Sequence, residues 1–148
     1  VIGGKIAQVG VPDDVYSRPN SIAVAEVIGS PPMNLFQGEF SKKGNFFEAE
    51  NFDARLALKG QSKHKGSATL GIRPEDIWLV EDGEETDFEL SIISVEPLGG
   101  YTILNAYLGE KIVKIRAPGQ VNVVEGSRQK VSFDPRRIHL FDDNGERL

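Results

Sequence analysis

Residues that could carry chemistry are sparse in this chain of 148 residues. A phosphate-binding loop needs a glycine-rich turn ending in Gly-Lys-Ser or Gly-Lys-Thr, because its backbone amides and its lysine hold the phosphates. The single Gly-Lys pair, Gly4-Lys5, is followed by Ile6, and the motifs typical of dinucleotide-binding folds, serine hydrolases and zinc proteases are absent. We therefore expect no catalytic residue in this sequence and no enzymatic activity of its own.

Metal, thiol and nucleic-acid chemistry also lack support. The chain has no cysteine, which excludes thiol chemistry and cysteine-based zinc sites, and its two histidines, His64 and His139, lie far apart in the sequence. Lysine and arginine number 17 against 22 aspartate and glutamate residues, for a net charge of −5. A nucleic-acid binder needs a basic face to neutralise phosphates. We expect no metal, no bound cofactor and no nucleic-acid partner.

Three polar residues are candidate contacts to a partner lobe or a small effector: Arg73 and Glu75, on either side of Pro74, and His139. Each also has a simpler structural interpretation, which is the favoured one. Pro74 would turn the chain at a strand end, and Arg73 would pair with a nearby carboxylate in a surface ion pair of little energetic weight. His139 could act as a pH-sensitive contact, but within an apolar run it is favoured as a satisfied structural histidine.

Aromatic and basic residues give further candidates. Trp78 could stack on a ligand, but a tryptophan within an Ile-Trp-Leu-Val run is favoured as a core residue. Tyr101 and Tyr107 flank an alternating segment, and we expect one of them to face an interface. The basic loop Lys59–Lys65 could hold an anionic partner, although a solvated loop is the favoured interpretation.

The elements that would position these residues begin with a turn and a short helix. Gly3-Gly4 suits the positive φ angles of a tight turn and predicts a β-hairpin over residues 1–9. Pro12 suits the first position of a helix, where its missing N–H has no partner to lose. Val11 is a poor N-cap, so we expect this first helix to be short.

A second short helix should follow one of two good caps, Asn20 or Ser21, and end at Gly29. The two prolines at 31–32 then forbid its continuation. The helix is apolar nearly all round, and the rest of the sequence offers no obvious helical partner. We therefore expect this apolar surface to pack against another domain or a partner, through Ile22, Val24 and Ile28.

From Asn34 onward the sequence predicts short strands separated by Gly, Asp and Asn, which is typical of a small barrel or sandwich. An acidic turn is expected at Glu81–Glu85. The alternation from Asp87 to Ile92 predicts a strand with one wet face. The ten expected strands are Leu35–Phe40, Phe46–Glu50, Ala54–Leu58, Ala68–Arg73, Ile77–Leu79, Phe88–Val95, Thr102–Leu108, Lys111–Arg116, Gln129–Phe133 and Ile138–Phe141.

The chain therefore divides into residues 1–30, with a hairpin and two helices, and residues 31–148, a β-rich lobe. No apolar run approaches the roughly 20 residues of a membrane span, and no signal peptide opens the chain, so we expect a cytoplasmic protein without direct membrane insertion. The first residue is not Met, and the sequence starts within an apparent strand. We interpret the sequence as a piece of a longer protein.

Five segments, in order, resemble one known family. The stretch from Ile6 through Arg18-Pro19 and the junction Ile28–Asn34 resemble the end of the nucleotide-binding domain of ATP-binding cassette importers, most closely the maltose-type and glycerol-3-phosphate-type subfamily. Further segments match downstream family signatures. Departures are Val11, where the family usually has a threonine cap, and Ala23 and Val27, where it often has phenylalanine. The downstream segments are Leu70–Asp76, Glu96–Gly99 and Phe133–Asp142.

The resemblance implies a mainly β, OB-like lobe of the MOP or TOBE (transport-associated OB) type, preceded by the hairpin and two short helices. It implies a regulatory and dimerisation domain whose complete subunit binds ATP and Mg and hydrolyses ATP to drive carbohydrate import. That subunit would be a homodimer, peripheral to the inner face of the cell membrane, in contact with permease subunits and its own nucleotide-binding domain. Effectors or regulatory proteins bind some members of the family.

An alternative from another class remains open at this point. OB-like barrels also occur as free-standing modules that bind an oligonucleotide, an oligosaccharide or an oxyanion. The negative net charge and the lack of aromatic residues interleaved with lysine and arginine argue against the oligonucleotide. The resemblance implies that the permease and the external binding protein, and not this chain, select the transported solute.

Overall fold

The computed structural model describes residues 1–50, 55–58, 63–84 and 88–148. Within these ranges the chain forms two helices, ten strands and one 3-10 turn, η1 (Pro74–Asp76), which lies between the fourth and fifth strands. Parts of three predicted features lie outside the described residues: the start of the strand at Ala54, most of the Lys59–Lys65 loop, and the segment from Glu85 to Asp87. The predicted mainly β fold with two short helices is confirmed.

The first sheet has five antiparallel strands. Its centre is the pair formed by β1 (Asn34–Phe40) and β4 (Ser67–Ile72), aligned from Asn34 opposite Ile72 to Glu39 opposite Ser67. Beyond them lie β10 on one side and β2 followed by β3 on the other. The bounds of these three strands are Phe46–Ala49 for β2, Arg55–Ala57 for β3 and His139–Phe141 for β10.

The second sheet is also antiparallel, in the order β5-β9-β6-β7-β8. Its longest ladder joins β7 to β8 over eight residue pairs, from Tyr101 opposite Pro118 to Leu108 opposite Lys111. The pairing of β6 with β7 shifts register between Ile92 and Ser94, so Ile93 sits in a β-bulge. The strands are β5 (Ile77–Leu79), β6 (Phe88–Pro97), β7 (Tyr101–Leu108), β8 (Lys111–Pro118) and β9 (Arg128–Phe133).

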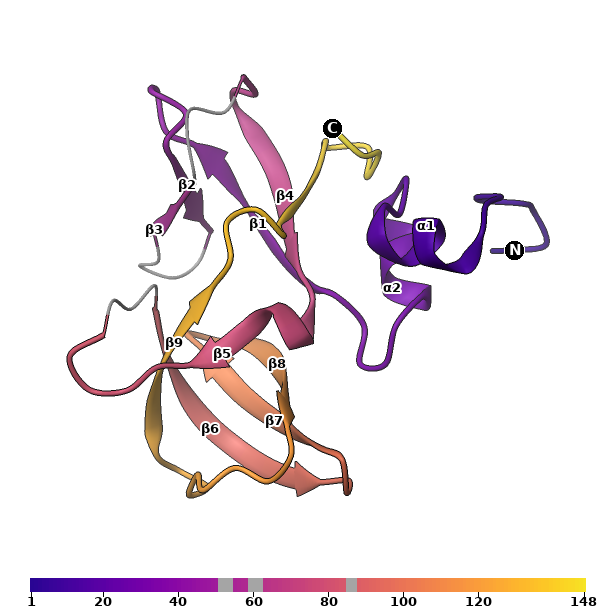
Figure 1. The fold of residues 1–148 in the computed structure, drawn as a ribbon. Helices are drawn as coiled ribbons and strands as arrows, with labels where there is room; N and C mark the ends of the chain where they lie inside the picture. The colour runs from indigo at the N-terminus through magenta and orange to yellow at the C-terminus, as the bar shows by residue number, and fades with distance from the viewer. Residues whose placement is uncertain (51–54, 59–62, 85–87) are drawn as a thin grey trace.

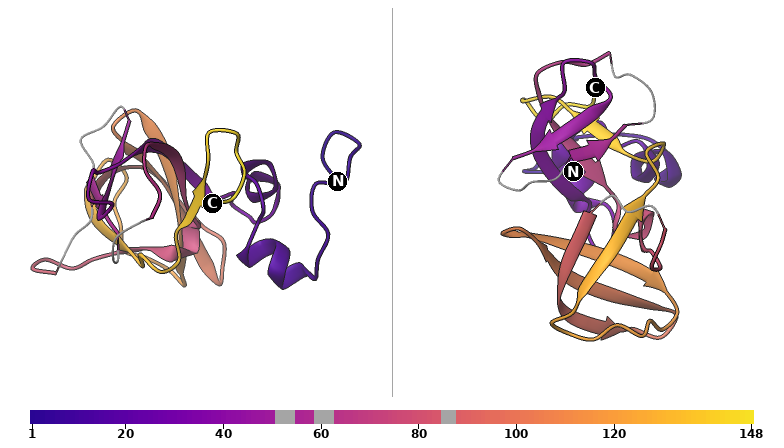
Figure 2. Two further views of the ribbon diagram at one scale, coloured as in Figure 1. Left: turned by 90° about the horizontal axis from the view of Figure 1, so that it is seen from above. Right: turned by 90° about the vertical axis from the view of Figure 1, so that its left-hand side faces the viewer.

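Both sheets share one hydrophobic core, so they form a single barrel-like lobe. Phe36, Phe47 and Leu70 from the first sheet belong to the same buried cluster as Leu104 and Val131 from the second. In Figure 1 the first sheet lies above the second, and the view from above in Figure 2 shows the strands as a ring with the helices beside it. All ten predicted strands are present, with ends shifted by a residue or two where described.

An asparagine side chain joins the two sheets where β1 begins. The Asn34 amide donates to the carbonyl of Lys114 over 2.8 Å, and its side-chain oxygen accepts from the Lys114 N–H over 2.9 Å. The side chain is buried, so these bonds satisfy polar groups that would otherwise be costly. The side chain therefore pairs with the backbone of β8 as a neighbouring strand would, and it holds the start of β1 in place.

The N-terminal helices follow the sequence signals closely. The first, α1 (Pro12–Ser17), begins after Val11 without any side-chain cap. The second, α2 (Ile22–Val27), is capped by Ser21, whose hydroxyl accepts from the Val24 N–H over 3.4 Å. No helix among the described residues is both long and apolar enough to cross a membrane.

The predicted hairpin over residues 1–9 was wrong in extent. Its turn exists, with positive φ at Gly3 and Gly4, but it is closed by one bridge in which Ile2 and Lys5 exchange both backbone bonds. Ile6 and Val9 beyond it are exposed. Because they bury little surface, nothing offsets the entropy of ordering them into a strand.

Trp78 also departs from its favoured interpretation as a core residue. It lies in β5 with 46% of its surface exposed, while its neighbour Ile77 is buried. Alternate residues of a strand face opposite sides. In the short strand Ile-Trp-Leu, Ile77 faces the core and the larger ring of Trp78 faces outward.

Candidate functional site

A buried arginine links the helices to the barrel. Arg73, at the end of β4, is only 2% exposed. Its guanidinium donates to the carbonyls of Tyr16 over 2.8 Å, Ala25 over 3.4 Å and Ile28, and its carbon lies 4.2 Å from the centroid of the Tyr16 ring. The guanidinium therefore satisfies carbonyls at the ends of both helices, which otherwise lack partners.

A second arginine makes a similar link from the C-terminal segment. Arg147 Nε donates to the carbonyl of Pro19 over 2.7 Å, and its Nη2 lies 2.7 Å from Nδ1 of His139. A guanidinium can only donate, so Nδ1 of His139 accepts and the ring carries its proton on Nε2. Burial, then the charges of Arg147 and Arg73, lowers the pKa of His139 to about 4.

Backbone bonds reinforce this link. Ile22 N–H donates to the carbonyl of Gly145 over 2.8 Å, and Arg147 N–H donates to that of Asn20 over 2.8 Å. Ala25 of α2 packs in a small buried cluster with Met33 and Phe141. We call this region, where residues 16–28 meet Arg73 and residues 139–147, the junction.

A cavity of about 440 Å³ opens at the junction. Arg136 and Arg137 lie at its rim with exposed side chains, paired with Asp134 over 2.9 Å and with Asp76 over 3.2 Å. The pairing with Arg136 lowers the pKa of Asp134 to about 2. We call this the junction cavity; it is lined by Tyr16, Ser17, Arg73, Glu75, Asp76, Arg136, Arg137, Ile138, His139 and Arg147.

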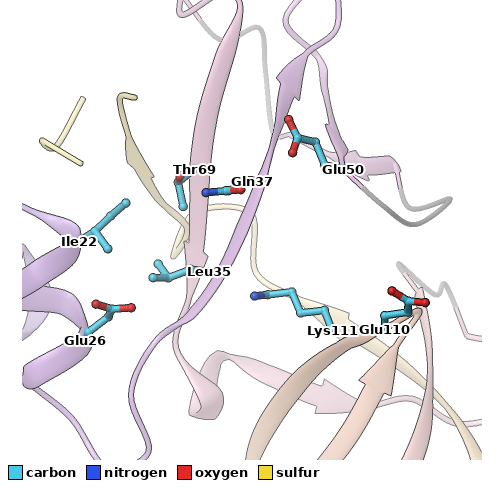
Figure 3. Close-up of a pocket in the computed structure, with 8 residues that line it drawn as sticks. All are labelled: Ile22, Glu26, Leu35, Gln37, Glu50, Thr69, Glu110 and Lys111. Atoms are coloured by element: carbon cyan, nitrogen blue, oxygen red, sulfur yellow. The ribbon is translucent and has the colours of Figure 1, made fainter. Parts of the chain in front are cut away.

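On another side of α2 lies a cleft of about 630 Å³ with the opposite charge. Three glutamates line it against a single lysine, and Figure 3 shows Lys111 pointing from the start of β8 toward β1, with Glu26 and Glu110 on opposite sides. We call this the acidic cleft; it is lined by Ile22, Glu26, Leu35, Gln37, Glu50, Thr69, Glu110 and Lys111.

Three of the predicted contact residues meet in the junction cavity: Arg73, Glu75 and His139. Glu75 is exposed there, whereas Arg73 and His139 are buried. His139 is buried and its ring contacts Arg147, as the structural interpretation expects, and its role stays a prediction. For Arg73 a surface role was wrong, and so was its expected carboxylate partner, because carbonyls of the two helices bind its guanidinium.

The predicted apolar face of α2 is partly used within the chain. Val24 is 4% exposed, so the prediction that it meets another domain or a partner was wrong: Ala25 beside it packs on Met33 and Phe141, partners that lie in extended segments rather than in a helix. Ile22 and Ile28 are half-buried, Ile22 at the acidic cleft and Ile28 at the junction.

Tyr101 lies apart from the junction, in β7. It is half-buried, and the guanidinium carbon of Arg116 lies 4.0 Å from its ring centroid. Tyr107 further along the strand is 45% exposed. Of the two tyrosines, Tyr107 thus presents the more open surface, and a role at an interface stays a prediction for either.

The sequence did not single out four residues that line the junction cavity: Tyr16, Arg136, Arg137 and Arg147. The adjacent arginines after Asp134-Pro135 carried a signal, since a basic pair at a turn concentrates charge in one place. Arg147 carried none, because it stands in an acidic tail. Among the described residues no group of three or more histidine, aspartate or glutamate side chains could hold a metal ion.

Comparisons with known families place this geometry. Residues 29–77 match the MalK OB fold domain, and residues 70–141 match the TOBE domain. The cytoplasmic molybdate-binding protein ModG, solved with molybdate bound, superposes on 72% of this chain and 94% of its own with a TM-score of 0.60. At 14% identity, that likeness shows the fold alone. The class is that of an OB-type, TOBE-containing β lobe.

Three relatives extend the match to the N-terminal helices. The chain is 40% identical, over 98% of its length, to the xylose/arabinose import ATP-binding protein XacK of Haloferax volcanii and spans 39% of that protein. It is 34% identical over 98% to the sulfoquinovosyl glycerol transport ATP-binding protein SmoE of Agrobacterium fabrum, spanning 41%. The sn-glycerol-3-phosphate import ATP-binding protein UgpC of Escherichia coli is also 34% identical, over 99% of the chain and 41% of its own length.

The particular family follows from these matches. Residues 29–141 carry the MalK OB fold and TOBE domains, and the chain is a homologue of the ATP-binding subunits of ABC sugar importers. The resemblance drawn from the sequence motifs is thereby confirmed. The chain spans about two fifths of the curated relatives it matches.

Proposed function

We propose that this chain is the regulatory and dimerisation region of the ATP-hydrolysing subunit of a carbohydrate importer. The observation that carries the proposal is the match to XacK, which covers 98% of this chain but only 39% of the relative. The complete subunit would hold ATP and Mg outside these residues, and this region would have no catalysis of its own. It would act beneath permease subunits at the cytoplasmic face of the membrane.

The junction supports a regulatory role. Because Arg73 and Arg147 bond both helices to the barrel, a shift of residues 16–28 would displace the end of β4 and the C-terminal segment as well. Packed side chains and hydrogen bonds of this kind can carry coupling between domains. The junction would thus transmit movement between a nucleotide-binding domain and the β lobe.

Exposed apolar side chains support packing of the N-terminal residues on that domain. Five valine and isoleucine side chains among residues 1–27 are at least 60% exposed. Exposed apolar side chains mark an interaction site where they form a contiguous patch, and we propose that these five do so against the nucleotide-binding domain. The five are Val1, Ile6, Val9, Val11 and Val27.

Dimerisation has a candidate surface on the outer face of the second sheet. Tyr107 and Ile112 are directly opposite each other in β7 and β8, 45% and 52% exposed. Ile93, in the bulge of β6, is also exposed. The centres of protein–protein interfaces are rich in aromatic and aliphatic side chains such as these.

Two measurements on the 148-residue chain test the proposal. Sedimentation velocity from low micromolar to near-millimolar protein should show a concentration-dependent dimer that Tyr107→Lys weakens. Val11→Lys is the control, because Val11 is 60% exposed and lies outside the second sheet. Calorimetric titration with Mg-ATP should give no heat of binding. A monomer at every concentration contradicts the dimerisation role, and micromolar affinity for ATP contradicts the whole assignment.

The alternative of a free-standing binding module rests on fold alone, through the likeness to ModG. It predicts tight binding of molybdate or of a single-stranded oligonucleotide by the chain itself. Titration with sodium molybdate, and filter binding with oligonucleotides at low salt, would separate it from the regulatory role.

A further inference from the structure

We propose that the junction cavity is an oxyanion site that binds phosphate or a small phosphate monoester. The site is built from Arg73 and His139 at its floor, Arg147 beside them, and Arg136 and Arg137 at its rim. The inference rests on the charge and geometry of these residues and does not depend on the proposed transport role.

The junction cavity has an excess of buried N–H donors. The two terminal nitrogens of the buried Arg73 donate to backbone carbonyls, and its Nε has no hydrogen-bond partner. Arg147 likewise bonds a carbonyl and an imidazole. Among the described residues neither arginine forms an ion pair with a carboxylate. Arg73 is compensated only in part, by the nearby charge of Asp76, and Arg147 lies near the positive charges of Arg18 and Arg73, so the cavity wall keeps an excess of positive charge.

The positive charges of Arg73 and Arg147 repel each other at the cavity. Burial, followed by the charges of Arg18 and Arg73, lowers the pKa of Arg147, and burial lowers that of Arg73. Cations disfavour one another at close range, especially away from water. A bound dianion would relieve this repulsion, so the buried arginines favour an anion beside them.

The arginines of the cavity differ in exposure, from a buried floor to an exposed rim. The rim side chains of Arg136 and Arg137 are 71% and 68% exposed, so a ligand can reach them from solvent. In each pair the arginine is exposed while its partner is mostly buried, with exposed side-chain fractions of 17% for Asp134 and 11% for Asp76. Planar guanidiniums bind phosphate oxygens with paired, charge-assisted bonds, better than lysine does.

Two features of the cavity define the ligand more closely. Glu75 and Asp76 also line it, and they offset part of the positive charge of the four arginines; the positive charge that remains attracts a dianion more strongly than a monoanion. A dianion such as phosphate gains more from four arginines. The volume of about 440 Å³ exceeds one phosphate and falls in the range of small-molecule sites. Tyr16 and Ile138 provide wall for a small organic group.

The test is calorimetry with inorganic phosphate and with methyl phosphate, at constant ionic strength, on the wild-type chain and two matched variants. Arg137→Gln removes a rim arginine paired with Asp76. Arg128→Gln is its control, because Arg128 is equally exposed and paired with Glu89, yet lies outside the cavity. We expect Arg137→Gln to weaken phosphate binding about tenfold, the loss of one charge-assisted contact.

Arg128→Gln should change the affinity by less than about twofold. Nuclear magnetic resonance of the guanidinium Nε–H groups should show phosphate shifting Arg73 and Arg147. Three results would overturn the inference: no binding at millimolar phosphate, equal losses in Arg137→Gln and Arg128→Gln, or an identical response to chloride. Both variants alter exposed side chains, so folding should persist, and circular dichroism checks it.

Discussion

The junction and the acidic cleft lie on two sides of the same short helix, and they handle charge in opposite ways. At the junction, cations are buried and bonded to backbone carbonyls, as Arg73 is. In the acidic cleft, Glu26, Glu50 and Glu110 are exposed to solvent. Water screens the second set of charges and not the first. The junction therefore fixes the position of α2, whereas the cleft leaves its other side open.

This difference explains how a helix of six residues is held at all. An isolated helix of that length is not stable in water, and α2 buries only Val24 and Ala25. The additional hold comes from arginine bonds to its C-terminal carbonyls and from the pairing of residues 20–22 with the C-terminal segment. Changes at the junction should consequently cost far more stability than changes in the acidic cleft.

The largest effect should come from Arg73→Met. The variant keeps apolar bulk but leaves the carbonyls of Tyr16, Ala25 and Ile28 without their donor. We expect the free energy of unfolding to fall by about 3–5 kcal/mol, as for other broken buried polar networks. Urea denaturation measures it. Arg128→Met, at an exposed ion pair, should lose less than about 1 kcal/mol, and similar losses in both would contradict the comparison.

The next largest effect is a pH dependence from His139. Its folded-state pKa is lowered to about 4 from 6.5, so between these values the unfolded state binds the proton first. Stability should therefore rise with pH from about 4 to 6.5 and level off above, a span of about 2–3 kcal/mol.

The measurement is urea denaturation across that pH range, for the wild type and for His139→Asn. Carboxylates also titrate in this window, so the informative quantity is the difference between the two proteins. The His139→Asn profile should lack the steeper slope between pH 4 and 6.5. Parallel profiles would show that the histidine is not buried against Arg147 as described.

A smaller effect should come from Gly29→Ala. Gly29 has φ +113°, and a Cβ there would lie 2.8 Å from Nη1 of Arg73. The substitution adds backbone strain and pushes the guanidinium off its carbonyls, for a loss of about 2 kcal/mol. Gly119→Ala is the control, with φ +66° and nothing within 4 Å of the added carbon. Equal thermal shifts in the two variants would show strain without any contribution from Arg73.

The smallest effect should come from the acidic cleft. Replacing Glu26 and Glu110 together by glutamine removes two exposed charges. We expect the free energy of unfolding to change by less than about 0.5 kcal/mol, because solvated side chains contribute little. Urea denaturation again measures it. A loss comparable to that of Arg73→Met would mean that the cleft, too, holds the helix.

The sequence predicted the strands well because each is a short apolar run between turn residues, and that pattern is local. It predicted α2 from Ser21 and Gly29 for the same reason. It could not predict the junction, since Arg73 and Ile28 are 45 positions apart and Arg147 and Pro19 are 128 apart. The residues that neighbour an arginine in the sequence do not indicate whether a carbonyl or a carboxylate will bind its guanidinium.

The central claim is that the arginines of the junction hold the helices on the barrel. Native-state hydrogen exchange on Arg73→Met tests it directly, by comparing the amides of Ala25 and Ile28 with that of Leu70 in the barrel core. We predict that the two α2 amides lose most of their protection while Leu70 keeps its own under native conditions. Unchanged protection of Ala25 and Ile28 in the variant would contradict the account.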